Sequence, residues 1–139
     1  MFEPWIARAL RDTRVARLWT LGADGAVRLV PICFAVVGNH VVSAVDHKPK
    51  RTGQLRRLDD MVASGTATVL FDHYDEDWTQ LWWVRIRGRA TVHDPGSRAG
   101  DPALAALAAK YAQYRAQPPT GSVYEVAIDE IRSWRHTPW

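Results

Sequence analysis

Apolar and polar residues alternate with a period of two along much of the chain, a pattern typical of β-strands that bury one face. The alternation is clearest at 81–92, LWWVRIRGRATV, where charged and apolar residues take turns. Turn signals such as Asp24-Gly25 and Gly38-Asn39 separate the first segments, which are expected to form an antiparallel meander. The strands predicted in this way are 15–21, 27–37, 41–45, 66–72, 81–93 and 123–128.

Three other segments carry apolar residues at intervals of three or four, as amphipathic helices do. The predicted helices are 4–13, 52–64 and 103–115. Pro4 suits a first helical turn, and Thr52 can cap the second helix. Six antiparallel strands and few helices in 139 residues predict one mainly β (α+β) domain, residues 1–139, built as a small closed or partly open barrel.

The charge balance adds little to this picture. Eighteen Lys and Arg residues against fifteen Asp and Glu residues give a formal net charge of +3. This mild excess supports a small anionic ligand as well as it supports nucleic acid. Barrels that bind single strands interleave basic and aromatic residues, whereas here the aromatic cluster at 78–83 lies apart from the basic one at 47–57. We therefore expect no nucleic-acid partner.

Compartment signals are few. Cys33 is the single cysteine, so no intramolecular disulfide can form, which fits a reducing compartment. It lies within a predicted apolar strand, and we expect it in the core. The first fourteen residues are too charged for a signal peptide, and no apolar run approaches the roughly 20 residues that span a bilayer. The expectation is a cytoplasmic protein without a membrane partner.

The basic stretch VDHKPKRTGQLRRL, residues 45–58, is the strongest chemical signal. Lys48, Lys50 and Arg51 follow a strand and precede a helix N-terminus, where free N–H groups and the helix dipole favour an anion. This arrangement suits a phosphate or a polycarboxylate. A solvated loop that balances nearby acids explains the same charges, and both readings stay open from the residues alone. Arg56 and Arg57 are assigned to the solvent-facing side of the helix.

Two further segments each allow two readings. DHYDED, residues 72–77, is rich in possible metal ligands, but its spacing fits no specific ligand pattern, so an acidic hairpin loop without a metal is favoured. In the strand 81–93, Trp83 shares one face with Arg85, Arg87 and Arg89. Three arginines on one face indicate either a solvated sheet surface or a dimer interface with acidic partners.

RLVPICF, HVVSAVDHKPKRTGQL and LWWVRIRGRA together resemble the pyridoxamine 5′-phosphate oxidase-like split-barrel flavoproteins over about 15–94. Within that superfamily, DHKPKRT combined with DHYDEDWTQLWWVR most resembles the actinobacterial branch that uses the deazaflavin coenzyme F-420. The resemblance implies a six-stranded antiparallel split barrel with flanking helices. It also implies a homodimer that holds its cofactors at the dimer interface.

The resemblance further implies which residues hold the cofactor. Lys50-Arg51 stands where the family has a phosphate-gripping basic pair, and Trp83 replaces the glutamine usual in the FMN oxidases, which argues against FMN. A poly-anionic cofactor such as F-420 suits a loop with several basic residues. The residues assigned to the cofactor are Val30, Pro31, Ile32, Ala44 and Val45 at the ring, with His47, Lys48, Lys50, Arg51, Thr52 and Trp83 around it.

The implied activity is an F-420-dependent oxidoreductase that passes a hydride from the reduced cofactor to an unsaturated small molecule. An FMN-binding reductase or oxidase of the same fold is the alternative, and a non-catalytic cofactor-binding protein is a third. No protein nucleophile is expected, and no catalytic residue is assigned. His47 and Tyr74 are the candidates for a proton donor.

Overall fold

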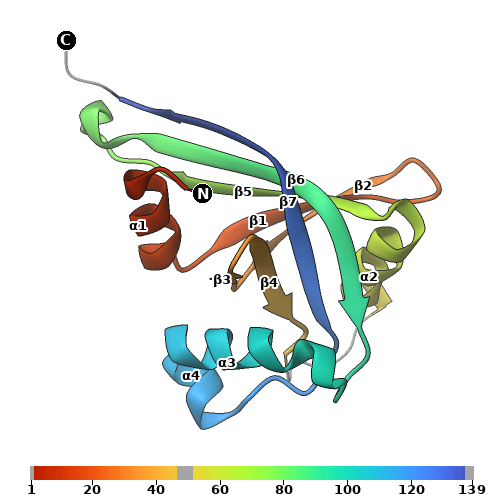
Figure 1. The fold of residues 1–139 in the computed structure, drawn as a ribbon. Helices are drawn as coiled ribbons and strands as arrows, with labels where there is room; N and C mark the ends of the chain where they lie inside the picture. The colour runs from red at the N-terminus through yellow and green to blue at the C-terminus, as the bar shows by residue number, and fades with distance from the viewer. Residues whose placement is uncertain (1, 47–51, 137–139) are drawn as a thin grey trace.

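The computed structural model describes residues 2–46 and 52–136, with the side chains of 52–55 excepted (Figure 1). Helices and turns of 3₁₀-helix flank a mainly β centre. The helical elements are α1 (Pro4–Asp12), α2 (Thr52–Ser64), η1 (Trp78–Gln80), η2 (Arg98–Gly100), α3 (Asp101–Lys110) and α4 (Ala112–Ala116). The strands are β1 (Ala16–Leu21), β2 (Val27–Ile32), β3 (Ala35–Val37), β4 (His40–Ala44), β5 (Thr66–His73), β6 (Trp82–His93) and β7 (Val123–Arg135).

In the described part of the chain, seven strands form one antiparallel sheet in the order β2-β1-β5-β6-β7-β4-β3. The sheet curls into a half-barrel (Figure 1). A register irregularity between Arg87 and Gly88 bends the long β6–β7 pair, and a Cβ at Gly88 would overlap the carbonyl oxygen of Ala127. Glycine at this position therefore allows the two strands to approach closely where the sheet turns. No helix of the described chain is long and apolar enough to cross a membrane.

The predicted strand 27–37 is two strands, so the prediction of six strands and of a simple meander is wrong. β2 and β3 lie at opposite edges of the sheet, although only Cys33 and Phe34 separate them along the chain. Three Cα–Cα steps cover at most about 11 Å, so the two edges must come close together at this crossing. The half-barrel is thus nearly closed at one end.

Side chains replace the missing strand pairing at the crossing. The Phe34 N–H donates to the Tyr111 hydroxyl at 3.0 Å, and this hydroxyl lies 3.1 Å from the Phe34 carbonyl oxygen. The Phe34 ring is fully buried and packs edge-on against Phe71. Burial raises the pKa of Tyr111 to about 12, so its hydroxyl keeps the proton that it donates. The crossing is therefore held by core packing and by a residue distant in sequence.

The core fills the inside of the curled sheet. Buried residues alternate along the strands, and α1 and α2 cover the sheet with Ile6, Leu10, Leu58 and Met61. A second apolar cluster forms where α3 and α4 pack on β3 and β4, around Leu107 and Tyr114. The predicted helix 103–115 is divided at Tyr111, whose extended backbone separates α3 from α4.

The last strand is longer than expected. β7 continues beyond residue 128 to Arg135 and pairs with β6 throughout, so Trp134 belongs to the sheet. The β6–β7 pair forms one side of the curled sheet, and its far end reaches beyond α1 (Figure 1).

Candidate functional site

A cavity of about 370 Å³ lies where the ends of β2 and β4 face each other. Its strand walls are residues 30–32 of β2 and Ala44 of β4, continued by Val45. These are the five residues assigned to the cofactor ring from the sequence, and folding brings all of them to one cavity. Its volume lies within the roughly 300–1,000 Å³ usual for small-molecule sites. We call this cavity the strand-end cavity.

Hydrogen bonds fix the two walls of the strand-end cavity relative to each other. The Ser43 hydroxyl donates to the Cys33 carbonyl oxygen at 2.6 Å and so links β4 to the crossing. The Val45 N–H donates to the Ser122 carbonyl, and the Gly121 N–H donates back to the Val45 carbonyl. A Cβ at Gly121 would lie 2.6 Å from the Val45 oxygen, so glycine is required for this approach. The cavity is therefore largely preformed.

Arg57, Tyr114 and Tyr124 supply polar groups to the lining, together with Ser43 and Asp46. The Arg57 guanidinium lies 5.8 Å from the centre of the Tyr124 ring, a cation–π arrangement. Burial raises the pKa of Tyr124, with the Arg57 charge acting in the opposite direction. Burial also raises the pKa of Tyr114, and the nearby Cys33 and Asp46 side chains add to that effect. Both phenols therefore stay protonated near neutral pH.

The location of Arg57 corrects the sequence interpretation. It was assigned with Arg56 to the solvent-facing side of α2, but Arg57 is half-buried and lines the cavity, whereas Arg56 is exposed. Arg57 lies one helical turn before the fully buried Met61, and this spacing was a usable signal for an inward position. A cation thus stands beside the predicted ring site.

Cys33 is also corrected. It was expected in the core of a strand, but it is half-buried, lies in the crossing between β2 and β3, and lines the strand-end cavity. Sequence reasoning also missed Ser43, Tyr114 and Tyr124 as lining residues. Ser43 interrupts an apolar run, which is a recognisable signal, whereas the two tyrosines reach the cavity from α4 and β7 through the fold alone.

The predicted basic loop adjoins this cavity along the chain. His47, Lys48, Lys50 and Arg51 lie outside the described residues, and their assignment stays a prediction. Asp46, which precedes the loop, lines the cavity, and α2 begins at Thr52 directly after it. The chain therefore passes from the cavity to a helix N-terminus within this basic stretch.

Trp83 lies in a different place. It lines a surface hollow of about 440 Å³ with Trp82, Trp134 and His73, and the Arg85 guanidinium lies 5.8 Å from the centre of its ring. Within one chain, Trp83 does not line the strand-end cavity. Its assignment to the cofactor stays a prediction that requires a second copy of the chain.

In the acidic loop between β5 and β6, two carboxylates accept hydrogen bonds from groups of the same segment. Asp75 accepts from the Asp77 N–H at 2.7 Å, and Asp77 accepts from the N–H and hydroxyl of Thr79. No group of three or more His, Cys, Asp or Glu side chains gathers as a metal site among the residues whose positions are described. Tyr74, a candidate proton donor, is exposed beside this loop and away from the strand-end cavity.

Comparison with known families decides the classification. The family described as "Pyridoxamine 5′-phosphate oxidase" matches residues 2–135, nearly the whole chain. The chain belongs to the pyridoxamine 5′-phosphate oxidase family. The predicted family resemblance is therefore confirmed at this level, while its F-420 branch stays a prediction. A comparison with curated proteins finds no match.

Solved structures share the fold of this family member at low sequence identity. The conserved hypothetical protein Rv2991 from Mycobacterium tuberculosis aligns with a TM-score of 0.77 at 18% identity, covering 100% of this chain and 90% of that one. HutZ, the heme storage protein from Vibrio cholerae, gives 0.73 at 10% identity with 96% and 93% covered. An FAD-binding protein from Mesorhizobium loti gives 0.67 at 18% identity with 96% and 92% covered.

Proposed function

We propose that this chain binds the deazaflavin coenzyme F-420 in the strand-end cavity and promotes hydride transfer to an unsaturated small molecule. The observation that carries the proposal is the meeting of Val30–Ile32 with Ala44 and Val45 in one cavity that leads along the chain into the basic loop. A cavity with apolar strand walls that leads into a basic loop suits a molecule with a flat ring system and an anionic tail. F-420 has this composition, since a phosphodiester and a poly-glutamate tail follow its ring.

The lining residues fit such a ring chemically. Val30, Ile32 and Val45 offer apolar contacts, and β2 is an edge strand whose free backbone groups can hydrogen-bond a ring edge. Pro31 has no N–H, so only its carbonyl oxygen can serve there. Proline is tolerated at this position because β2 has no neighbour on its outer side within the described sheet.

The protein's contribution is binding, orientation and exclusion of water. When bound, the reduced deazaflavin supplies the hydride. The preformed walls around Ser43 and Gly121 hold a ring in one orientation, and Tyr114 and Tyr124 offer hydroxyl protons for hydrogen bonding because their pKa values are raised. Arg57 places a positive charge beside the cavity and favours an anionic portion of the ligand.

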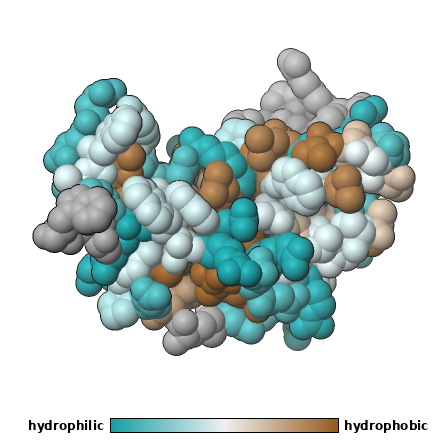
Figure 2. Space-filling model, turned by 90° about the horizontal axis from the view of Figure 1, so that it is seen from above, coloured by the Kyte–Doolittle hydropathy of each residue, from teal (hydrophilic) through white to brown (hydrophobic). Residues whose placement is uncertain are grey.

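We further propose that two copies of the chain assemble through the outer sheet face, defined as Trp19, Leu29, Thr68, Leu70, Arg85 and Arg87. Leu29 is 64% exposed and Trp19 36% exposed, and the two are paired across β1 and β2. Apolar patches lie among polar side chains on this side of the molecule (Figure 2). An aromatic and arginine-rich surface with an apolar centre is typical of protein interfaces.

The absorbance spectrum of the purified protein, a cofactor titration and a turnover assay test the cofactor proposal. Protein expressed in a host that lacks F-420 should be colourless and should bind added F-420 with micromolar or tighter affinity in a fluorescence titration. Reduced F-420 should then be oxidised when an α,β-unsaturated ketone or a quinone is added with the protein. A copurified flavin spectrum would instead support the FMN alternative, and a Soret band would indicate heme; either result would contradict the F-420 proposal.

Replacing Leu29 by aspartate is expected to shift the dimer towards monomers. The substitution removes an apolar contact at the proposed interface and adds a carboxylate that must lose its water there, so the dimer dissociation constant should rise at least about tenfold. Val62, which is 71% exposed on α2, provides the matched control, because Val62→Asp adds the same charge away from the sheet face. Light scattering after size exclusion measures the state. A monomeric unmodified chain, or Leu29→Asp that dimerises equally well, would contradict the interface.

A further inference from the structure

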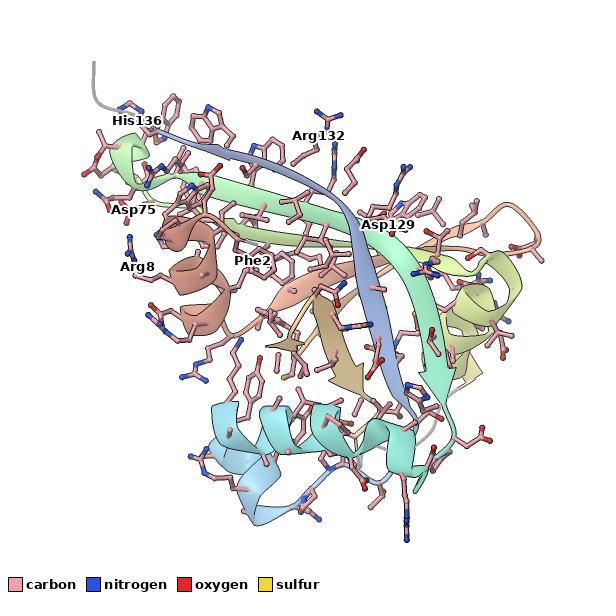
Figure 3. All side chains as sticks on the ribbon, in the orientation of Figure 1. Phe2, Arg8, Asp75, Asp129, Arg132 and His136 are labelled. Atoms are coloured by element: carbon pink, nitrogen blue, oxygen red, sulfur yellow. The ribbon has the colours of Figure 1, made fainter. Side chains whose placement is uncertain are left out.

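A second cavity, about 550 Å³ in volume, lies between α1 and α3 and is named the α1–α3 cavity. In Figure 3, α1 is the helix beside the Arg8 label, and α3 lies below it; α1 packs on the core inside the curled sheet, whereas α3 belongs to the second apolar cluster on β3 and β4. The α1–α3 cavity shares no lining residue with the strand-end cavity. Its apolar lining includes Phe2, Leu10, Ala35, Val36, Ala106 and Ala109.

Positive charge is concentrated at one side of this cavity. Arg11, Arg14 and Lys110 line it together with one acid, Asp12. The Asp12 carboxylate pairs with Arg11 at 3.4 Å, and both of those side chains are well exposed. Arg14 donates to the Lys110 carbonyl oxygen at 2.7 Å, so these two residues are held together. Neither Arg14 nor Lys110 forms an ion pair with a carboxylate of the described chain.

Lys110 is half-buried, and its ammonium group faces the cavity region from α3. Its Nζ donates to the Leu10 carbonyl oxygen at 3.0 Å and lies 3.6 Å from the centre of the Phe34 ring and 5.5 Å from that of Tyr111. Burial and, to a smaller extent, the nearby Arg14 charge lower the pKa of Lys110 to about 8, while Cys33 and Asp12 act in the opposite direction. Two neighbouring cations therefore lack a full countercharge in a partly desolvated place.

We propose that the α1–α3 cavity binds a small amphipathic carboxylate. Its carboxylate accepts hydrogen bonds from Arg14 and Lys110, and its hydrocarbon portion packs on the apolar lining formed by α1, β3 and α3. A single negative charge next to the two cations relieves their repulsion. An inorganic phosphate would leave the apolar lining unused, whereas a neutral lipid would leave the cations without a partner. This site is separate from the proposed cofactor site and does not depend on it.

The charge state of Lys110 gives the site a pH dependence. The protonated ammonium attracts the carboxylate, and the neutral amine does not. Lys110 is increasingly neutral above pH about 8, so affinity should fall as the pH rises through this value. Guanidinium groups are not deprotonated in this range, so residual binding through the arginines of the cavity persists at higher pH.

Octanoate is the probe for this site, and 1-octanol is its neutral counterpart. Calorimetric titration of the full chain without any cofactor should show millimolar or tighter octanoate binding, with octanol at least about tenfold weaker. Lys110→Met keeps an apolar stem and should weaken octanoate binding about tenfold or more. Arg8→Gln is the matched control, since Arg8 points away from the sheet on the outer side of α1 (Figure 3).

A second variant keeps the test independent of any folding defect in Lys110→Met. Ala109 is exposed at the rim of the cavity, so Ala109→Trp should obstruct it and abolish octanoate binding without disturbing the core. Ala105→Trp adds the same ring to an exposed position of α3 outside the lining and should leave binding unchanged. Undetectable binding at millimolar octanoate, equal affinity for octanol, or full binding by a folded Ala109→Trp chain would each overturn the proposal.

Discussion

Replacing Lys50 and Arg51 together by alanine is expected to raise the dissociation constant for F-420 about 10²- to 10⁴-fold. Each charge-assisted contact to an anion is worth roughly 1.5–3 kcal/mol, and about 1.4 kcal/mol corresponds to a factor of ten. The chain enters this pair from Asp46, at the strand-end cavity, and leaves it into the N-terminus of α2. The free N–H groups at a helix N-terminus favour the same anion that the two side chains would bind.

The control for this variant must lose the same charge elsewhere. Arg8 and Arg98 are exposed and line neither cavity, so Arg8→Ala with Arg98→Ala lowers the net charge by the same amount. Its affinity for F-420 should stay within about twofold of the unmodified chain. Fluorescence titration of both double variants at two salt concentrations distinguishes a direct contact with the cofactor from a general effect of net charge on affinity. Unchanged affinity in Lys50→Ala with Arg51→Ala would refute the role of the basic pair.

Replacing Asp60 by alanine is expected to lower the free energy of unfolding by about 3 kcal/mol or more. Asp60 is only 5% exposed; its carboxylate accepts from Arg28 at 2.8 and 2.9 Å and from the Thr20 hydroxyl at 2.8 Å. Removal of the carboxylate leaves a partly buried guanidinium and a buried hydroxyl without this partner. The expected loss corresponds to a melting temperature lower by roughly 10 °C.

Asp59 supplies the matched comparison, because it is the exposed neighbour of Asp60 on α2. Asp59→Ala should change the free energy of unfolding by less than about 0.5 kcal/mol in urea denaturation. A double-mutant cycle with Arg28→Met isolates the Arg28–Asp60 coupling. Equal stability of the Asp59 and Asp60 variants would show that this buried pair does not anchor α2. Since Arg57 lies three positions before Asp60 on the same helix, this anchor also positions Arg57 at the strand-end cavity.

Elements with local signals were predicted closely from the sequence. The helix 52–64 was expected from its apolar spacing and from the capping residue Thr52, and α2 has these bounds. The strand 27–37 was not predicted correctly, because its break at Cys33 and Phe34 depends on Phe71 and Tyr111, which are distant in sequence. A continuous apolar run looks the same whether its residues pair with one neighbour or cross from one sheet edge to the other.

The candidate site was also predicted only in part from the sequence. The residues at the ends of β2 and β4 were assigned through the family resemblance, and the fold gathers them in one cavity. Arg57 was misassigned because it was placed with Arg56 on the helix side away from Leu55 and Leu58, although its guanidinium lies over the Tyr124 ring. Tyr114 and Tyr124 arrive from α4 and β7, and no spacing in the sequence places them beside Val30.

The pairing of β4 with β7 has a consequence for the order of folding. The β3–β4 hairpin contacts the rest of the sheet through β7, the last strand of the described chain. During synthesis, the hairpin cannot pair with the rest of the sheet until β7 has emerged. Closure of such a long loop is entropically slow, and the unpaired edge is prone to association until closure occurs. The strand-end cavity, built partly on β4 and on Tyr124 of β7, is therefore complete only after this late pairing, and ligand binding there reports that β7 is in place.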